Sequence, residues 1–555
     1  MELPVKMVGG RAIATVGIDG TPVPLVVDSG AFFSFLTEAA ASQLKLRIQP
    51  TPPGLEVYGL AGKVRTHMTT VKHMQLAKGE IPDVDFVVGG NEPGGGAMGL
   101  LGRNILSFTD TEYDLAHGMI RLVFPSDECE HSNMAYWAGE TPVSELDLLH
   151  EFHERTPEIS ADIQVNGHGV TAVFDTGAET VVSLRTAHRV GVKDSDMTPQ
   201  GQSAGAGAGR MDAWNAPFDQ VDLGGESVRH NRLEIDDFDS SDEMLVGIDF
   251  FLSHHVYVSK KQWKMFFTYN GGPIFALNHG DHGSHGADKG AADALKADDL
   301  ARRGAASLSR GDFAGALADL DRACALEPAN AEFLTTRAAI HVAQEHPDKA
   351  LADLDAALRL DPAQDQARID RAALNGQRDE RDKALEDLVA LDKRLAPQSE
   401  MRRTMASLYD ELDMPSRALA QWNLWIAAHK HDIGLDEAYN SRCWERVELG
   451  TELDRALDDC DEAIDADGKN ASFLDSRAWV YLRLGKPQKA LSDFNRGLAI
   501  KTDGASSLYG RALVHLSLGE ASAAQADLAA ARKADPKIDD SVRKSGLPVA
   551  PAAKP

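Results

Sequence analysis

Short apolar runs separated by Gly, Pro and Asn fill the first half of the chain. Residues 1–125 and 158–277 are rich in Val and Gly, and stretches such as "PLVVDSG" (24–30) are brief. Runs of this length, bounded by turn residues, predict β-strands. From about residue 295 the composition changes to Ala, Leu, Asp, Arg and Glu, as is typical of helices. The pattern therefore predicts a multidomain protein with an all-β first half and an all-α second half.

The β-rich half contains one segment twice, 147 residues apart. The stretch "IDGTPVPLVVDSGA" (18–31) aligns with "VNGHGVTAVFDTGA" (165–178), which sets Asp28 on Asp175 and Gly30 on Gly177. Further along, "LLGRNIL" (100–106) has a counterpart in "LVGIDFF" (245–251). One Asp-Ser/Thr-Gly would be a weak signal, but several matched features in the same order predict two related lobes.

Two related lobes can pack about a pseudo-twofold axis, which would bring Asp28 and Asp175 face to face. Two carboxylates that share a site cannot both ionise at low cost, so one pKa rises and one proton is shared. Such a pair can take a proton from water while it polarises or protonates a scissile amide. The pair titrates as a unit, so neither Asp has a fixed role. We expect these two residues to be catalytic.

The neighbouring residues suit this chemistry. The glycines allow sharp turns near the carboxylates, and the hydroxyls can cross-link the two loops. We expect supporting roles for Ser29, Gly30, Ala31, Thr176, Gly177 and Ala178. Two Gly-rich segments read as flexible hairpin tips that could close over an extended peptide and exclude water. The expected substrate-binding residues there are Tyr58, Gly59, Leu60, Ala61 and Gly62 in the first lobe, and Gly205, Ala206, Gly207, Ala208 and Gly209 in the second.

Both lobes resemble the retropepsin-like aspartic proteases, through "DSGA" (28–31), "DTGA" (175–178) and the later "LLGRN" and "LVGID". The resemblance implies an all-β, two-lobed pseudo-dimer that cleaves peptide bonds without a metal or cofactor. It further implies a bacterial protein, periplasmic or exported if a signal peptide has been removed and cytoplasmic otherwise. Three alternatives stay open: the two loops are plain Asx-type turns, the lobes bind peptides without cutting them, or lobes exchange between chains to form a dimer.

The second half repeats with a period near 34 residues. An Ala recurs at 316, 350, 384, 418, 456, 490 and 524. This spacing resembles the tetratricopeptide repeat (TPR), whose units are helix hairpins. The resemblance implies a TPR superhelix of about seven repeats over 295–540, with a groove that binds a substrate or partner protein.

Charged residues recur within the repeats as well. Arg recurs on the first helix of the units and Asp on the second, and both are lost together in the fourth unit, which has Met405 and Gln421. Joint loss predicts that each Arg pairs with an Asp instead of forming a ligand-binding row.

Four cysteines are too few for a disulfide framework. Cys443, Cys460 and Cys324 fall where other units have small or apolar residues, so we expect core thiols without a redox or metal role.

The remaining segments predict less chemistry. In the interlobe segment, 126–157, Tyr136 and Trp137 are expected to pack instead of binding a ligand, and the spacing of His150 and His153 does not fit a zinc site. The Gly/His-rich stretch 278–294 is expected to be a solvated linker, with weak metal binding as the alternative. The tail 541–555 is expected to be disordered.

The net charge of −28 argues against nucleic-acid partners, and no apolar run is long enough to insert in a membrane. Together these features predict an aspartic endopeptidase with a TPR arm that recruits substrate or partner, the alternative being a non-catalytic peptide-binding scaffold.

Overall fold

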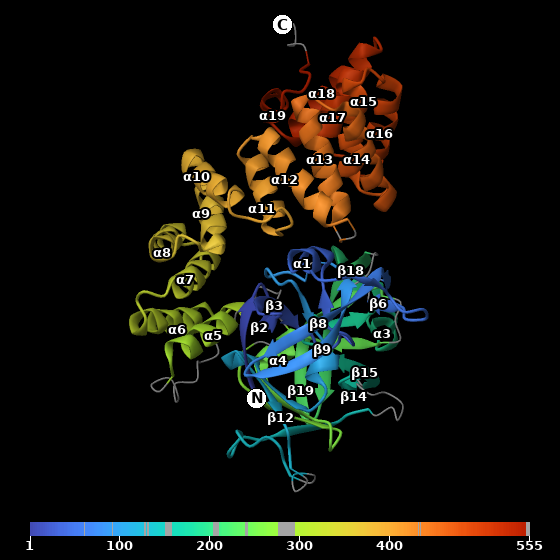
Figure 1. Ribbon diagram of the computed structural model, residues 1–555. Helices are drawn as coiled ribbons and strands as arrows, with labels where there is room; N and C mark the ends of the chain where they lie inside the picture. Colours follow the sequence, from blue (N-terminus) through green and yellow to red (C-terminus); the bar gives the residue numbers. More distant parts are fainter. Residues whose placement is uncertain are drawn as a thin grey trace. The chain divides into compact units, whose positions relative to one another are not determined.

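The computed structural model describes residues 1–59, 62–91, 93–126, 129, 132–149, 158–203, 210–238, 242–272, 274–275, 295–430, 432 and 434–550 (Figure 1). It divides into two compact units, Met1–Arg371 and Ala372–Pro555. The first unit holds the two β-rich lobes and the first helices, and the second holds the remaining helices. None of the helices in the described ranges is long and apolar enough to cross a membrane.

Lobe 1 is built from short strands with two small helices. Its strands are β1 (Glu2–Val8), β2 (Arg11–Ile18), β3 (Thr21–Val27), β4 (Phe35–Leu36), β5 (Gln49–Pro50), β6 (Val57–Gly59), β7 (Gly62–Val64), β8 (Thr66–Leu76), β9 (Gly79–Gly89), β10 (Gly99–Leu101), β11 (Asp110–Asp114) and β12 (Met119–Val123). Its helices are α1 (Glu38–Gln43), α2 (Arg103–Leu106) and the 3₁₀ turn η1 (Leu115–His117).

Lobe 2 repeats this plan. Its strands are β14 (Ser160–Val165), β15 (His168–Phe174), β16 (Val181–Ser183), β17 (Thr198–Ser203), β18 (Met211–Leu223), β19 (Glu226–Asp236), β20 (Met244–Val246), β21 (His254–Ser259) and β22 (Lys264–Tyr269). Its helices are α3 (Leu184–Arg189), α4 (Ile248–Ser253) and the 3₁₀ turn η3 (Asp194–Asp196). The hydroxyls of Thr37 and Ser183 cap α1 and α3 in the same way.

The pairing of strands shows that the duplication is structural. In lobe 1, β10 runs parallel to β3 and antiparallel to β4, with Leu100 opposite Val26. In lobe 2, β20 runs parallel to β15 and antiparallel to β16, with Leu245 opposite Val173. Each lobe therefore ends its central strand, β3 or β15, beside a strand that carries the later apolar-apolar-Gly motif.

The last strands of the two lobes join in one sheet. Strand β11 pairs with β21, with Thr111 opposite Val258, and β12 and β22 extend the sheet on either side. Strand β13 (Ser144–Asp147), from the interlobe segment, pairs with β22. This sheet fastens lobe 1 to lobe 2 within a single chain.

Of the two interlobe aromatics, Trp137 packs as predicted, whereas Tyr136 is 67% exposed. The ring of Trp137 stacks on His255 with centroids 3.8 Å apart, and its Nε1 donates to the Thr268 hydroxyl at 2.9 Å. The Tyr136 hydroxyl donates to Glu112. His150 and His153 lie outside the described residues, and so does the whole predicted linker, 278–294.

The second half of the chain is a run of helix pairs. In chain order they are α5 (Ala297–Ser309) with α6 (Phe313–Leu326), α7 (Ala331–Ala343) with α8 (Pro347–Leu360), α9 (Asp365–Gln377) with α10 (Arg381–Asp392), α11 (Met401–Glu411) with α12 (Pro415–Ala428), α13 (Leu435–Leu449) with α14 (Leu453–Ala466), α15 (Ala471–Arg483) with α16 (Pro487–Ile500), and α17 (Ala505–Ser517) with α18 (Ala521–Ala534). Pro at the first turn of α8, α12 and α16 fixes where these helices begin. The seven predicted hairpins are present, and the fold is that of a TPR array.

The predicted Arg–Asp pairing is confirmed. In five pairs, the arginine Nε and Nη2 both donate to one carboxylate: Arg303–Asp319, Arg337–Asp353, Arg442–Asp459, Arg477–Asp493 and Arg511–Asp527. In the fourth unit, Gln421 accepts instead from Arg402 at 2.6 Å. These arginines tie the two helices of a hairpin together.

Two of the cysteine predictions are wrong. Cys443 on α13 and Cys460 on α14 form a disulfide instead of remaining core thiols. Both are fully buried, and their Cα atoms lie 5.7 Å apart, within the range a disulfide spans. Two facing core positions of one hairpin happen to carry Cys together, which spacing along the chain does not reveal. Cys324 and Cys129 are not bridged.

The tail is more ordered than predicted. Helix α19 (Ile538–Lys544) runs past residue 540, and Leu547 is 7% exposed against the last helices. The Ala550 amide donates to the Tyr509 hydroxyl at 2.9 Å. The missed signal was apolar Leu547, which packs, whereas Val549 is 49% exposed.

Candidate active site

Asp28 and Asp175 occupy matching positions, each directly after the central strand of its lobe. The Asp28 amide donates to the Leu101 carbonyl at 3.0 Å, and the Asp175 amide donates to the Val246 carbonyl at 2.9 Å. These bonds continue the parallel pairing of β3 with β10 and of β15 with β20. The sheet of each lobe therefore fixes the backbone from which its carboxylate projects.

The two carboxylates meet between the loops. The Gly30 amide lies 3.0 Å from an oxygen of Asp28 and 3.0 Å from an oxygen of Asp175, and so donates to both. The Ala31 amide donates to Asp28 at 2.6 Å, and the Gly177 amide donates to Asp175 at 2.7 Å. The two carboxyl groups also influence the pKa of each other. The sequence prediction that these two residues come face to face agrees with this geometry.

Close approach explains the glycines. A Cβ atom at Gly30 would overlap the carboxylate of Asp175, and one at Gly177 would overlap that of Asp28. Each glycine thus leaves room for the acid of the opposite lobe. Any larger residue would push the loops apart.

The hydroxyls after the aspartates cross-link the lobes. The Ser29 amide donates to the Thr176 hydroxyl oxygen at 3.0 Å, and the Thr176 amide donates to the Ser29 hydroxyl oxygen at 2.9 Å. Each hydroxyl then donates to a carbonyl of the opposite lobe, Ser29 to Phe174 at 2.9 Å and Thr176 to Val27 at 2.8 Å. Both side chains are buried. We call these four bonds the hydroxyl cross-link.

Burial raises the pKa of both acids. For Asp28 the rise is partly offset by hydrogen bonds from Ala31 and Gly30. For Asp175 burial is joined by the charge of Asp28, so its pKa lies well above the ordinary value. One proton held between the two carboxyls is therefore the favoured state over a range of pH.

Two residues near the dyad were not found by sequence reasoning. Arg11, at the start of β2, donates to the Gly177 carbonyl of the opposite lobe, and its charge lowers the pKa of Asp28. Tyr113 on β11 is buried, and the charges of Asp175 and Asp28 help to raise its pKa. Arg11 has Glu158 at the matching place in lobe 2, so no repeated motif marked it.

The first Gly-rich segment forms the predicted hairpin in part. Strands β6 and β7 pair with Tyr58 opposite Lys63 and Gly59 opposite Gly62, and Tyr58 is 64% exposed. The Tyr58 hydroxyl donates to Glu56 at 2.9 Å. Leu60 and Ala61 lie outside the described residues.

In lobe 2, the strands on either side of the second Gly-rich segment pair at Ser203 and Met211. Gly205, Ala206, Gly207, Ala208 and Gly209 themselves lie outside the described residues. The substrate-binding role of both segments stays a prediction.

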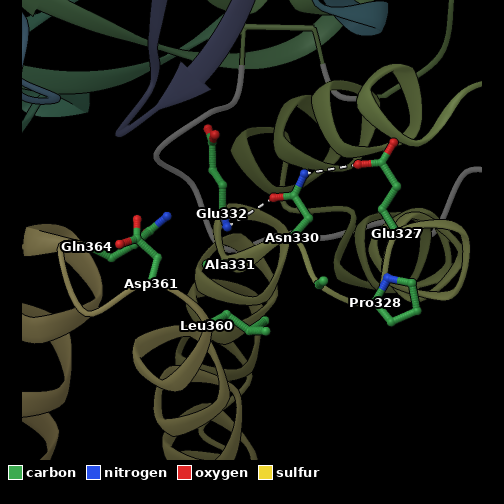
Figure 2. Close-up of a pocket in the computed structure, with 9 residues that line it drawn as sticks. Glu327, Pro328, Asn330, Ala331, Glu332, Leu360, Asp361 and Gln364 are labelled. Carbon is green, nitrogen blue, oxygen red and sulfur yellow. Dashed lines mark hydrogen bonds between the residues drawn. The ribbon is translucent and has the colours of Figure 1, made fainter.

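A separate depression of about 540 Å³ lies where the first three hairpins connect. Figure 2 shows its polar wall, in which Asn330 lies between Glu327 and Glu332. The Asn330 side chain accepts from the Glu332 amide at 3.1 Å and donates to Glu327 at 3.2 Å (Figure 2). Asn330 thus caps α7, and this wall serves the turn between helices.

The first half of the chain consists of two β-rich lobes that each match an aspartic protease family, and the second half has the fold of a TPR array. The family described as "gag-polyprotein putative aspartyl protease" matches the chain twice, over residues 14–107 and 161–253, once in each lobe. Each match includes its Asp-Ser/Thr-Gly-Ala loop. No curated protein matches the chain.

Solved structures similar to the chain are TPR proteins. One is a tetratricopeptide repeat protein from Parabacteroides merdae ATCC 43184, with 20% identity over 45% of this chain and 98% of that one, at a TM-score of 0.34. Another is YrrB, described as a TPR protein with an unusual peptide-binding site, with 18% identity over 35% of this chain and 97% of that one, at a TM-score of 0.31. A third is PilW, a type IV pilus biogenesis factor, with 20% identity over 37% of this chain and 94% of that one, at a TM-score of 0.32.

Proposed function

We propose that this protein is an aspartic endopeptidase whose dyad, Asp28 and Asp175, activates water for attack on a peptide bond. The observation that carries the proposal is the pair of carboxyl groups, Asp28 buried and Asp175 partly buried, that accept hydrogen bonds from the same Gly30 amide. A structural Asx turn needs one carboxylate on its own loop and no partner from another lobe. The shared position therefore favours catalysis over plain turns.

The mechanism follows from one shared proton. The ionised carboxyl accepts a proton from water as the water oxygen attacks the peptide carbonyl carbon. The protonated carboxyl hydrogen-bonds to the carbonyl oxygen and stabilises the charge that develops there. Proton transfer to the amide nitrogen then releases the amine product and returns the dyad to its starting state. The dyad lies within one chain, which supports an active monomer over lobes exchanged between chains.

The flanking parts are assigned to substrate handling. The hairpin of β6 and β7, with exposed Tyr58 and Gly62 near its tip, would close over an extended peptide together with the Gly-rich segment of lobe 2. The TPR array would hold a substrate or partner protein, since stacked helix hairpins offer extended surfaces for peptide segments. The alternative is a peptide-binding scaffold without catalysis. It would use the same binding parts, but Asp28 and Asp175 would not activate water.

Cleavage of a diverse peptide library between pH 3 and 8, with products identified by mass spectrometry, tests the proposal. The wild type is compared with Asp175→Asn and with Asp196→Asn, the same change at an exposed site on η3. Cuts made by the wild type and by Asp196→Asn, and absent with Asp175→Asn, would support the proposal. Peptide binding without cleavage by the wild type would favour the scaffold instead.

A further inference from the structure

Glu445 on α13 occupies a position that is apolar in the other repeats. It stands two residues after Cys443, and the matching positions hold Ile340, Leu374, Leu408, Val480 and Val514, all buried. Glu445 is itself 1% exposed. A carboxylate has therefore replaced a core aliphatic side chain in the fifth hairpin.

Two more acids gather around it. Carboxylate oxygens of Asp410 on α11, Glu445 and Glu448 all lie within 4.8 Å of one another. Asp410 also departs from the repeat, because the matching positions hold Gly376 in the third repeat and Leu308, Val342, Val447, Leu482 and Leu516 in the others. Two adjacent repeats thus each supply an acid at a position where their neighbours are apolar. We call these three residues the acidic cluster.

The acidic cluster is only partly compensated by the protein: the side chains of Ser545 and Trp444 hydrogen-bond to Glu448, and the charge of Glu448 acts on Arg483. One carboxylate oxygen of Glu445 is buried and makes no hydrogen bond within the described part of the chain. Glu448 accepts from the Trp444 indole at 3.0 Å. Within those same ranges, no Lys or Arg forms an ion pair with Asp410, Glu445 or Glu448.

The cations nearby are bound elsewhere. Arg446, next to Glu445, is paired with Asp459 and Glu452. Arg483 donates to the carbonyl oxygens of Glu448 and Gly546, at 3.3 and 2.7 Å. Lys544 and Arg381 are both paired with Asp413. None of these charges neutralises the buried carboxylate.

A buried carboxylate oxygen without a partner is unfavourable unless a proton or a cation satisfies it. A bound cation would remove this cost by satisfying the unbonded oxygen and screening the three charges from one another.

We propose that Asp410, Glu445 and Glu448 bind a hard divalent cation, for which Ca²⁺ is the best fit. The donors are all oxygens, whereas zinc sites in proteins usually include Cys or His. Ca²⁺ accepts flexible geometry with carboxylates and water, and the exposed side of Asp410 admits water. The ion would bridge α11 and α13 and so fix one hairpin against the next, beside the Cys443–Cys460 disulfide.

Terbium luminescence on the full-length protein tests the site directly. Tb³⁺ substitutes for Ca²⁺, and Trp444, which touches Glu448, is placed to sensitise it. We expect saturable Tb³⁺ emission that added Ca²⁺ displaces, and a rise in Tm with Ca²⁺. Glu445→Gln, close in shape, should weaken binding at least tenfold, as should Asp410→Asn, which changes an exposed residue. Glu411→Gln, which removes a neighbouring exposed charge outside the cluster, should change binding less than twofold.

Two results would overturn the proposal. One is Tb³⁺ binding to Glu445→Gln and Asp410→Asn as tight as to the wild type, because the ion would then lie elsewhere. The other is a wild-type Tm that does not respond to Ca²⁺ up to about 10 mM, well above the dissociation constants of weak protein calcium sites. Trp444→Phe should lose the Tb³⁺ signal while keeping the Tm response to Ca²⁺.

Discussion

The two lobes agree where they meet and differ where they face outward. Around the dyad the loops are nearly the same, with Ser29 against Thr176 and Gly30 against Gly177. One residue beyond Ala31 and Ala178, lobe 1 has Phe32 and lobe 2 has Glu179. Residues that hold both carboxylates must suit both lobes at once, whereas residues that face outward are free to diverge. The comparison separates the parts that build the dyad from those that would select a substrate.

The divergence gives the lobes opposite character. In lobe 1, Phe32 is 43% exposed and the Arg103 guanidinium lies 5.6 Å from its ring centroid. In lobe 2, burial and the charges of Asp236 and Glu179 raise the pKa of Glu234 to about 7. The lobe 1 residue at the place of Glu234 is the buried Val87, because Val87 lies opposite Phe35 as Glu234 lies opposite Val181. Lobe 1 is thus apolar where lobe 2 is acidic.

The largest expected effect comes from the glycines that both lobes share. Gly30→Ala and Gly177→Ala each place a methyl group on the opposite carboxylate, so the loops must separate. A displacement of about 1 Å can cost about 100-fold in rate, and we expect losses of that order in kcat/KM from both changes.

Gly169→Ala is the matched control, because a Cβ atom there meets its nearest atom at 3.7 Å and its φ is ordinary. It should leave kcat/KM within about twofold of the wild type. If Gly30→Ala or Gly177→Ala cleaves as fast as Gly169→Ala, the dyad does not have the geometry described above.

The hydroxyl cross-link should show the next largest effect. Ser29→Ala and Thr176→Val each remove a buried hydroxyl that accepts one hydrogen bond and donates another across the lobes. A buried group left unpaired costs about 1–3 kcal/mol, so each change should lower the free energy of unfolding of the β-rich half by a comparable amount. The denaturant midpoint should fall accordingly. Thr176→Ser keeps the hydroxyl, so its free energy of unfolding should stay close to that of the wild type.

The double variant tests whether the bonds act as a unit. Residues in one network give non-additive effects, so Ser29→Ala with Thr176→Val should cost less than the sum of the single changes. Strict additivity, measured by urea unfolding, would show that the two hydroxyls stabilise their lobes independently.

The aspartate pair could be predicted from the sequence because the duplication places the same short motif in both lobes. Asp28 and Asp175 each belong to a short motif that recurs in order, and the strands around them repeat as well. Arg11 could not be found in this way, because it acts on the opposite lobe and its counterpart is Glu158. Contacts made once, across an interface, leave no periodic signal along the chain.

The helical half follows the same rule. The hairpins and the Arg–Asp pairs could be predicted from a period of 34 residues, because each repeat supplies its own evidence. The Cys443–Cys460 disulfide and the acidic cluster occur in single repeats. Comparing Glu445 with the apolar residues at matching positions would have marked it, since a departure from a repeat is also a signal.

The outward residues should sort substrates, with a smaller effect than the changes at the dyad. We expect the wild type to favour an apolar side chain on the lobe 1 side of the cut and a basic one on the lobe 2 side. Glu179→Gln should lower cleavage of the basic sites about three- to tenfold, equivalent to about 0.7–1.4 kcal/mol, and leave apolar preference unchanged. Phe32→Ala should lower cleavage of sites with an apolar side chain and leave the preference for basic sites unchanged. Cleavage profiles of the peptide library measure both effects. If the profiles of both variants equal that of the wild type, neither residue selects substrate.

The smallest expected effect is a difference in stability with pH. Burial raises the pKa of each dyad acid above its unfolded value of 3.8. The resulting stabilisation is therefore fully present below about pH 3.8 and is lost as pH rises through the folded-state pKa. Asn cannot ionise, so Asp28→Asn and Asp175→Asn should gain stability relative to the wild type as pH rises from 4 to 7.

The relative size of the two gains tests the comparison of the lobes at the dyad itself. Arg11 places a positive charge near Asp28, and this charge lowers the pKa of Asp28. Asp175→Asn should therefore gain more, by an amount on the order of 1 kcal/mol. Urea unfolding of the three proteins at several pH values measures this. Identical curves for the two variants would mean that the proton is shared equally, and that the difference between the lobes does not extend to Asp28 and Asp175.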